Sequence, residues 1–107
     1  MKISQGDSYP IFFKLTQAGY VLTPDMLDDM RVCVGEVLEF QLSKNEVFFD
    51  NDLQLWYFRP SQADTMLLDP ESYQVDARVK YTNDPADVIK IPCGRITVEE
   101  SSDKKEI

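Results

Sequence analysis

The chain has 107 residues, 43% of them hydrophobic and 11% aromatic, which is enough for one domain with its own core and too little for two. Nineteen acidic residues against 11 basic ones give a formal net charge of −8, which disfavours binding to nucleic acid and to anionic membranes. The sequence has no histidine, the commonest general base and zinc ligand, so we expect no enzymatic activity, no cofactor and no small-molecule substrate.

In the first regular segment, residues 9–16, the side chains follow the two-residue period that is typical of a β-strand. The alternation places Ile11, Phe13 and Leu15 on one face and Phe12 on the other. A turn and a short return strand are expected next. We therefore predict that one face of this strand lies in the core and that Phe12 points away from it.

The middle of the chain continues with short strands and one helix start. Thr23 followed by Pro24 is a favourable beginning for about one turn of helix. Alternating segments at residues 30–35 and 36–42 predict two further strands. Residues 46–50 and 53–59 predict a tight hairpin joined through Asn51-Asp52, because asparagine tolerates a positive φ.

The hairpin contains the most informative aromatic run. In a strand, Trp56 and Phe58 face one way, while Leu55 and Tyr57 face the other. A two-layer sandwich buries only one face of each strand. The second face is then covered either from within the domain or by another chain, and Phe12, Leu55 and Tyr57 are the candidate interface residues.

The last third predicts a short helix and the longest strands. Ser61 and Asp64 have the spacing of a capping box. Residues 72–82 alternate cleanly, which indicates an antiparallel sheet with one buried face. After a turn at residues 83–87, shorter strands are expected at residues 88–91 and 95–99.

Seven to eight short strands with one or two single-turn helices predict an all-β fold, as an antiparallel β-sandwich or a small barrel. The domain is expected over residues 1–100, with a flexible tail at residues 101–107. No secretory signal or membrane helix is expected, because the apolar runs are too short. We therefore expect synthesis in the cytoplasm.

Two cysteines and two acidic clusters are the residues that could supply chemical sites. Cys33 and Cys93 each lie in a strand-like run, and both free thiols and a disulfide between neighbouring strands are compatible with that placement. Residues 50–52 and 25–29 are rich in acids, but they lack the spacing of a calcium-binding loop. A hairpin turn and a helix start explain them, and no metal site is predicted.

One family resemblance emerges from several stretches of the chain. They begin with Gly6-Asp7-Ser8 and the alternating Ile11, Phe13 and Leu15. The stretches that carry the resemblance are residues 6–15, 19, 21–23, 55–58, 73–79 and 94–99. Together they resemble the N-terminal, Ig-like domain of phage baseplate upper proteins and small stand-alone prophage proteins of Gram-positive bacteria. The resemblance implies an Ig-like β-sandwich.

The resemblance also implies a function. It predicts a structural component of a phage tail or baseplate that contacts itself or other phage structural proteins and ends up in the virion. Two alternatives come from the residues. An acidic regulatory or inhibitor module would bind one host protein, and a carbohydrate-binding sandwich would stack a sugar on Trp56 or Tyr57.

Overall fold

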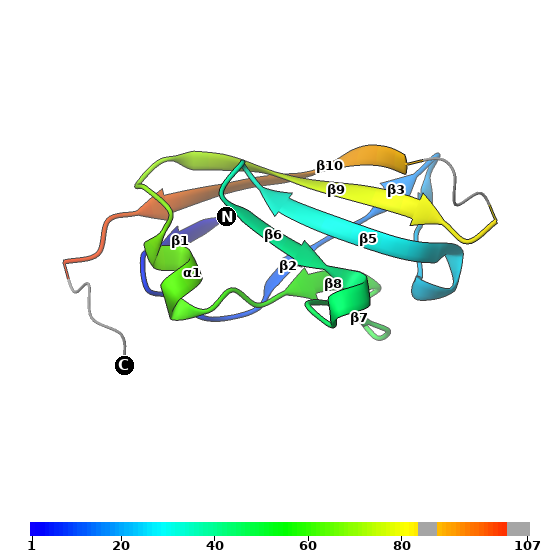
Figure 1. The fold of residues 1–107 in the computed structure, drawn as a ribbon, viewed down its shortest axis with the longest axis horizontal. Coiled ribbons are helices and arrows are strands. Elements are labelled where there is room, and N and C mark those ends of the chain that lie inside the picture. Colours follow the sequence, from blue (N-terminus) through cyan, green and yellow to red (C-terminus); the bar gives the residue numbers. More distant parts are fainter. Residues whose placement is uncertain (84–87, 103–107) are drawn as a thin grey trace.

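The computed structural model describes residues 1–83 and 88–102. The described chain forms two facing sheets and a small hairpin, so the predicted all-β sandwich is confirmed (Figure 1). The predicted turn at residues 83–87 lies almost wholly outside the described residues, and so does the predicted tail from residue 103 onward.

The larger sheet has five strands and the smaller one three. In spatial order the larger sheet contains β1 (Lys2–Ser4), β10 (Val88–Glu99), β9 (Ser72–Tyr81), β5 (Leu27–Val34) and β6 (Leu38–Gln41). The smaller sheet contains β2 (Ile11–Phe13), β8 (Leu55–Phe58) and β7 (Val47–Asp50). The separate hairpin is β3 (Thr16–Gln17) with β4 (Tyr20–Val21).

The core lies between the two sheets. Phe58 of the smaller sheet packs its ring 4.7 Å from that of Phe40 in the larger sheet and 6.1 Å from that of Phe13. On β9 the predicted alternation is confirmed, because Tyr73, Val75, Ala77 and Val79 are buried, whereas the residues between them are exposed or half-buried. Period-two alternation therefore identified the inner face of the longest strands correctly.

Two features depart from the antiparallel prediction of seven to eight strands. The described residues contain ten strands, and β1 pairs with β10 in parallel. The segments expected at residues 88–91 and 95–99 are one strand, β10, interrupted by a bulge between Pro92 and Gly94. Proline lacks an N–H for the ladder, and Gly94 has φ 132°, so the strand bends there without ending.

The predicted strand at residues 9–16 is also divided. Its pairing with β8 ends at Phe13, and from Thr16 the chain pairs with its own return strand β4. The backbone N–H of Leu22 donates to the carbonyl of Leu15 at 2.9 Å, which extends the pairing of this hairpin by one step toward the sandwich. Leu15 remains fully buried, so the predicted alternation continues across the break.

The hairpin between β7 and β8 is looser than predicted. Four residues, 51–54, connect the strands, and Gln54 adopts the positive φ of 55° that was expected at Asn51. The Asp50 carboxylate explains the difference, because its Oδ1 accepts hydrogen bonds from the backbone N–H groups of Asp52 and Leu53, both at 3.0 Å. That bonding favours a wider turn.

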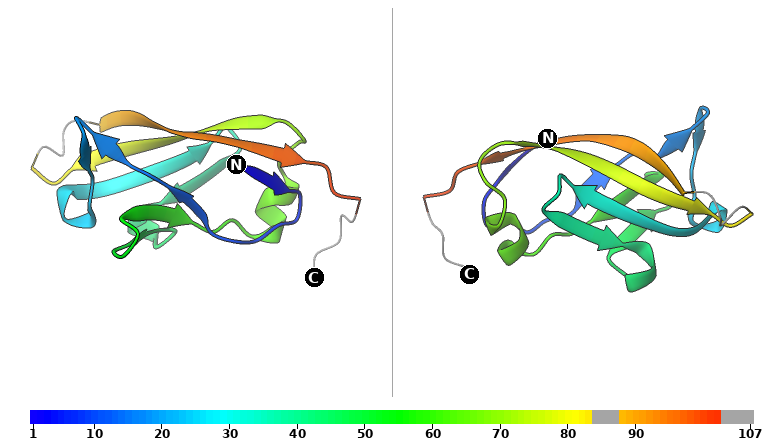
Figure 2. Two further views of the ribbon diagram at one scale, coloured as in Figure 1. Left: turned by 180° about the vertical axis from the view of Figure 1, so that it is seen from behind. Right: turned by 45° about the horizontal axis from the view of Figure 1, so that its top comes forward.

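Both predicted helix starts are present, although Thr23 makes no side-chain capping hydrogen bond. The 3₁₀ helix η1 (Pro24–Met26) follows Thr23, and α1 (Gln62–Met66) begins with a complete capping box between Ser61 and Asp64. A second 3₁₀ helix, η2 (Leu42–Lys44), joins β6 to β7. Figure 2 shows α1 beside one end of the sandwich, away from the strands of the smaller sheet. No helix in the described part of the chain is long and apolar enough to cross a membrane.

Candidate interaction surface

The three predicted interface residues lie on the outer face of the smaller sheet. Phe12 of β2 stands directly opposite Tyr57 of β8, and their ring centroids are 5.0 Å apart. Leu55 lies two residues from Tyr57 on the same face of β8, and both are half-buried. Strand geometry therefore brings together the residues that alternation assigned to this face.

A fourth side chain, Phe48, completes the surface and was not predicted. Phe48 of β7 stands opposite Tyr57 on its other side, with ring centroids 5.4 Å apart. The result is a line of three rings across three strands, which we call the aromatic row (Phe12, Tyr57 and Phe48). Cross-strand aromatic pairs of this kind stabilise one another by about 0.5–1.5 kcal/mol.

The aromatic row is open to solvent in the described structure. Phe12 is 40% exposed and Phe48 is 41% exposed, while Tyr57 between them is half-buried. Among residues 1–83 and 88–102, cover of the row from within the domain is therefore only partial. The row is therefore a preformed apolar surface held by the backbone of three strands.

The other face of β8 is fully buried in the core. Trp56 and Phe58 have no exposed surface. The Trp56 Nε1–H donates to the carbonyl of Leu22 at 2.8 Å, and its ring meets Phe49 edge-on at 5.0 Å. Trp56 is therefore closed to a sugar, and Tyr57 is the residue left to the carbohydrate-binding alternative as a stacking platform.

Acidic clusters are used for structure in the described chain. Asp50 holds the β7–β8 turn, and Asp29 accepts hydrogen bonds from Gln41, Ser43 and the backbone of Met30. Burial alone would raise the pKa of Asp29, but these hydrogen bonds outweigh it and lower the pKa. Within the described residues, no group of three potential ligand side chains could hold a metal ion.

The two cysteines are free and separated by a strand. Cys33 on β5 stands opposite Asp76 of β9, and Cys93 lies in the bulge on the far side of β9. Cys33 faces outward between the buried Val32 and Val34, whereas Cys93 packs against the core. Since β5 and β10 are not neighbours, the condition for the predicted disulfide alternative is not met.

The burial of Cys93 predicts weak thiol reactivity. Burial raises the pKa of the Cys93 thiol to about 11. At about pH 8 roughly one thiol in a thousand is then ionised, and alkylation of a Cys33→Ser variant by iodoacetamide should be slow and accelerate about tenfold per pH unit. Mass spectrometry of the time course measures this. A rate equal to that of a free peptide thiol at about pH 8 would contradict the prediction.

Comparisons of the chain with protein-family models, curated proteins and solved structures found no match.

Proposed function

We propose that this chain is a structural protein of a phage or prophage tail or baseplate and that it acts through protein–protein contacts without catalysis. The observation that carries the proposal is the aromatic row, in which Phe12, Tyr57 and Phe48 stand in register on one sheet face with the two outer rings exposed. Aromatic residues are enriched in the centres of protein interfaces. A rigid surface of this kind costs little entropy when a partner covers it.

The phage assignment is supported by the resemblance at the start of the chain, and the same residues form a defined turn. Gly6 has φ 89°, a value that favours glycine. The Asp7 carboxylate accepts a hydrogen bond from the backbone N–H of Ser4 at 2.8 Å. The motif therefore has a structural role at the entry to β2, which suits a component of a rigid assembly.

An acidic regulatory module remains the second candidate, because the net charge of −8 favours a basic partner. Its partner would be one host protein, and the chain would be a monomer without it. The solution mass over a range of concentrations distinguishes the two. A dimer or a larger ring supports the assembly role, whereas a monomer that forms a one-to-one complex with a single host protein supports the regulatory role.

The phage assignment is tested in particles released by the strain that carries the gene. After prophage induction, particles purified on a density gradient are analysed by quantitative mass spectrometry. We expect the chain in a fixed ratio to the major tail protein. Its absence from purified particles, together with its presence in the lysate, would overturn the assignment.

The role of the aromatic row is tested by a Phe12→Ser, Phe48→Ser double variant. We expect incorporation into particles to fall at least about tenfold, because both outer rings of the contact are lost. The free energy of unfolding should fall by about 1–3 kcal/mol, because two ring pairs are lost while both side chains are already partly exposed.

Tyr20→Ser is the matched control for this experiment, because Tyr20 is a 73% exposed aromatic residue on β4, outside the row. It should be incorporated like the unchanged chain. Normal incorporation of the folded double variant would show that the contact lies elsewhere.

A further inference from the structure

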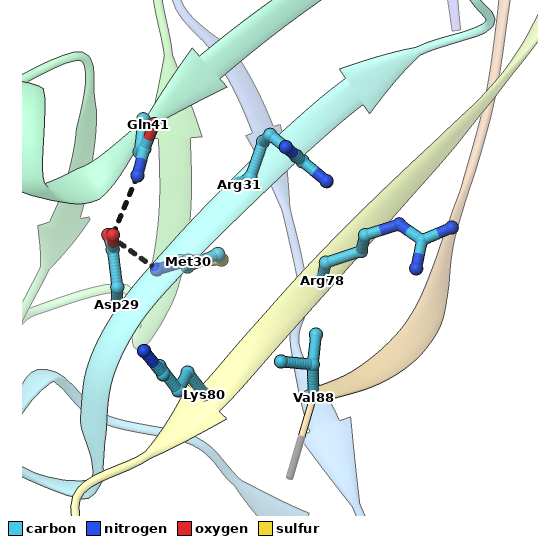
Figure 3. Close-up of a pocket in the computed structure, with 7 residues that line it drawn as sticks. All are labelled: Asp29, Met30, Arg31, Gln41, Arg78, Lys80 and Val88. Atoms are coloured by element: carbon cyan, nitrogen blue, oxygen red, sulfur yellow. Dashed lines mark hydrogen bonds between the residues drawn. The ribbon is translucent and has the colours of Figure 1, made fainter. Parts of the chain in front are cut away.

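Basic side chains gather on the outer face of the larger sheet, the side of the sandwich opposite to the aromatic row. Arg31 of β5 stands directly opposite Arg78 of β9, and Lys90 of β10 stands opposite Arg78 on the other side. Lys80 follows Arg78 on the same face of β9 (Figure 3). In a chain with a net charge of −8, these four cations occupy one small area.

Three of these cations have no carboxylate partner in the described structure. The ion pairs found among the described residues are Lys90 with Asp76, at 3.5 Å, and Lys2 with Glu99. Arg31, Arg78 and Lys80 take part in neither. We call these three residues the cation row. Like charges directly opposite each other destabilise a sheet, so the Arg31–Arg78 pair opposes folding.

The nearest acid on this face is committed elsewhere. Both carboxylate oxygens of Asp29 accept hydrogen bonds, from the Gln41 side chain at 2.7 Å, from the Met30 backbone at 2.8 Å and from Ser43 at 3.0 Å (Figure 3). Asp29 stands opposite Lys80 in the pairing of β5 with β9 and lines the same groove, but these bonds hold its carboxylate toward the β6–η2 connection, and no ion pair joins it to Lys80. Asp76 is already paired with Lys90. Glu39 of β6 forms no ion pair with Arg31 in the part of the chain that the structure describes.

A groove of about 270 Å³ lies beside the cation row, and Arg31, Arg78 and Lys80 all line this groove. A guanidinium group donates two parallel hydrogen bonds to a carboxylate, which makes arginine the preferred residue for such contacts. Neighbouring strands are about 4.8 Å apart, and alternate residues along a strand are about 6.7 Å apart. Acids at alternate positions of an extended segment have the same spacing as Arg78 and Lys80 along β9.

We propose that the cation row binds an acidic segment of another protein chain, whose carboxylates supply the missing counter-ions of Arg31, Arg78 and Lys80. The chemistry favours a protein over a nucleic acid. Three cations on a surface that also carries Asp29, Asp76 and Glu39 neutralise few phosphates, and the net charge of −8 repels a polyanion. The site is separate from the aromatic row and does not depend on the phage assignment.

The probe is a fluorescein-labelled peptide of alternating Glu and Ser, with a peptide of alternating Gln and Ser as its neutral counterpart. Fluorescence anisotropy with the full chain should show binding of the acidic peptide alone, weakening between about 50 and 200 mM salt. Labelled oligothymidylate should bind more weakly than the acidic peptide. Stronger binding of oligothymidylate, or equal binding of the two peptides, would overturn the proposal.

Arg78→Gln tests the residues, and Arg59→Gln is the matched control, because Arg59 is an exposed arginine at the end of β8 in the other sheet. We expect Arg78→Gln to weaken binding of the acidic peptide about tenfold and Arg59→Gln to change it less than about twofold. Equal weakening by both would show that net charge alone attracts the peptide, and the proposal would fail.

Thermal unfolding separates a binding role from a structural one. Arg78→Gln removes one of two opposed cations, so its melting temperature should be equal to or higher than that of the unchanged chain. If that variant does not fold, Arg31→Gln removes the same opposed pair from β5 and is expected to give the same two results. A lowered melting temperature in both variants, with peptide binding unchanged, would assign these arginines to the fold instead.

Discussion

Replacing Trp56 by alanine is expected to lower the free energy of unfolding by about 3–5 kcal/mol, a large part of the total stability of a domain this size. Trp56 has no exposed surface, and its ring meets Phe49 edge-on at 5.0 Å. The substitution leaves a cavity between the sheets and also removes the hydrogen-bond donor of the Leu22 carbonyl. Urea unfolding followed by circular dichroism measures the loss, since the variant lacks the single tryptophan whose fluorescence would otherwise report unfolding.

Trp56→Phe separates the two contributions. It keeps a ring in the core but loses the Nε1–H that bonds to Leu22, so we expect a smaller loss of about 1–3 kcal/mol. A loss of less than about 1 kcal/mol in Trp56→Ala would contradict the burial of this side chain. The result also bears on function, because the backbone that carries Trp56 inward carries Tyr57 outward into the aromatic row.

Local patterns predicted the local structure well. The capping box at Ser61 and Asp64 and the inner face of β9 both follow from residues within one segment, and both are confirmed. The parallel pairing of β1 with β10 was not predicted, because Lys2 and Thr97 are partners from opposite ends of the chain. No periodicity within either segment carries the information that they are neighbours.

The aromatic row shows why the candidate site was only partly predictable. Alternation assigned Phe12, Leu55 and Tyr57 to the outer face, and that placement needs no knowledge of strand pairing. The neighbour of Tyr57 on β7 depends on the length of the hairpin loop. A two-residue loop at residues 51–52 would have placed Glu46 opposite Tyr57, whereas the observed loop of four residues places Phe48 there.

The cation row depends on strand order even more strongly. Arg31 and Arg78 lie in segments 47 positions apart, and only the pairing of β5 with β9 brings them opposite each other. The alternation of β9 shows that Arg78 and Lys80 point outward, but it does not show which residues of the adjacent strands lie beside them. Surface sites built across strands therefore have to be found in the folded structure, whereas the core positions beneath them can be found in the sequence.

Thr65→Val is expected to lower the free energy of unfolding by about 1–3 kcal/mol, although valine has nearly the same shape. Thr65 is fully buried in α1. Its hydroxyl accepts a hydrogen bond from the backbone N–H of Gly6 and donates one to the carbonyl of Asp7, both at 2.9 Å. Valine leaves both backbone groups without this partner, and thermal unfolding of the variant measures the cost.

Thr65→Ser is the matched control, because it keeps the hydroxyl and loses only a methyl group. We expect it to be more stable than Thr65→Val, and the reverse order would show that packing of the methyl group matters more than the hydrogen bonds. The expected order has a structural meaning. Asp7 and Gly6 lie 58 and 59 positions from Thr65 in the sequence, and one hydroxyl bonds to both. Thr65 therefore ties the Gly6-Asp7 turn, and with it the entry to β2, to α1.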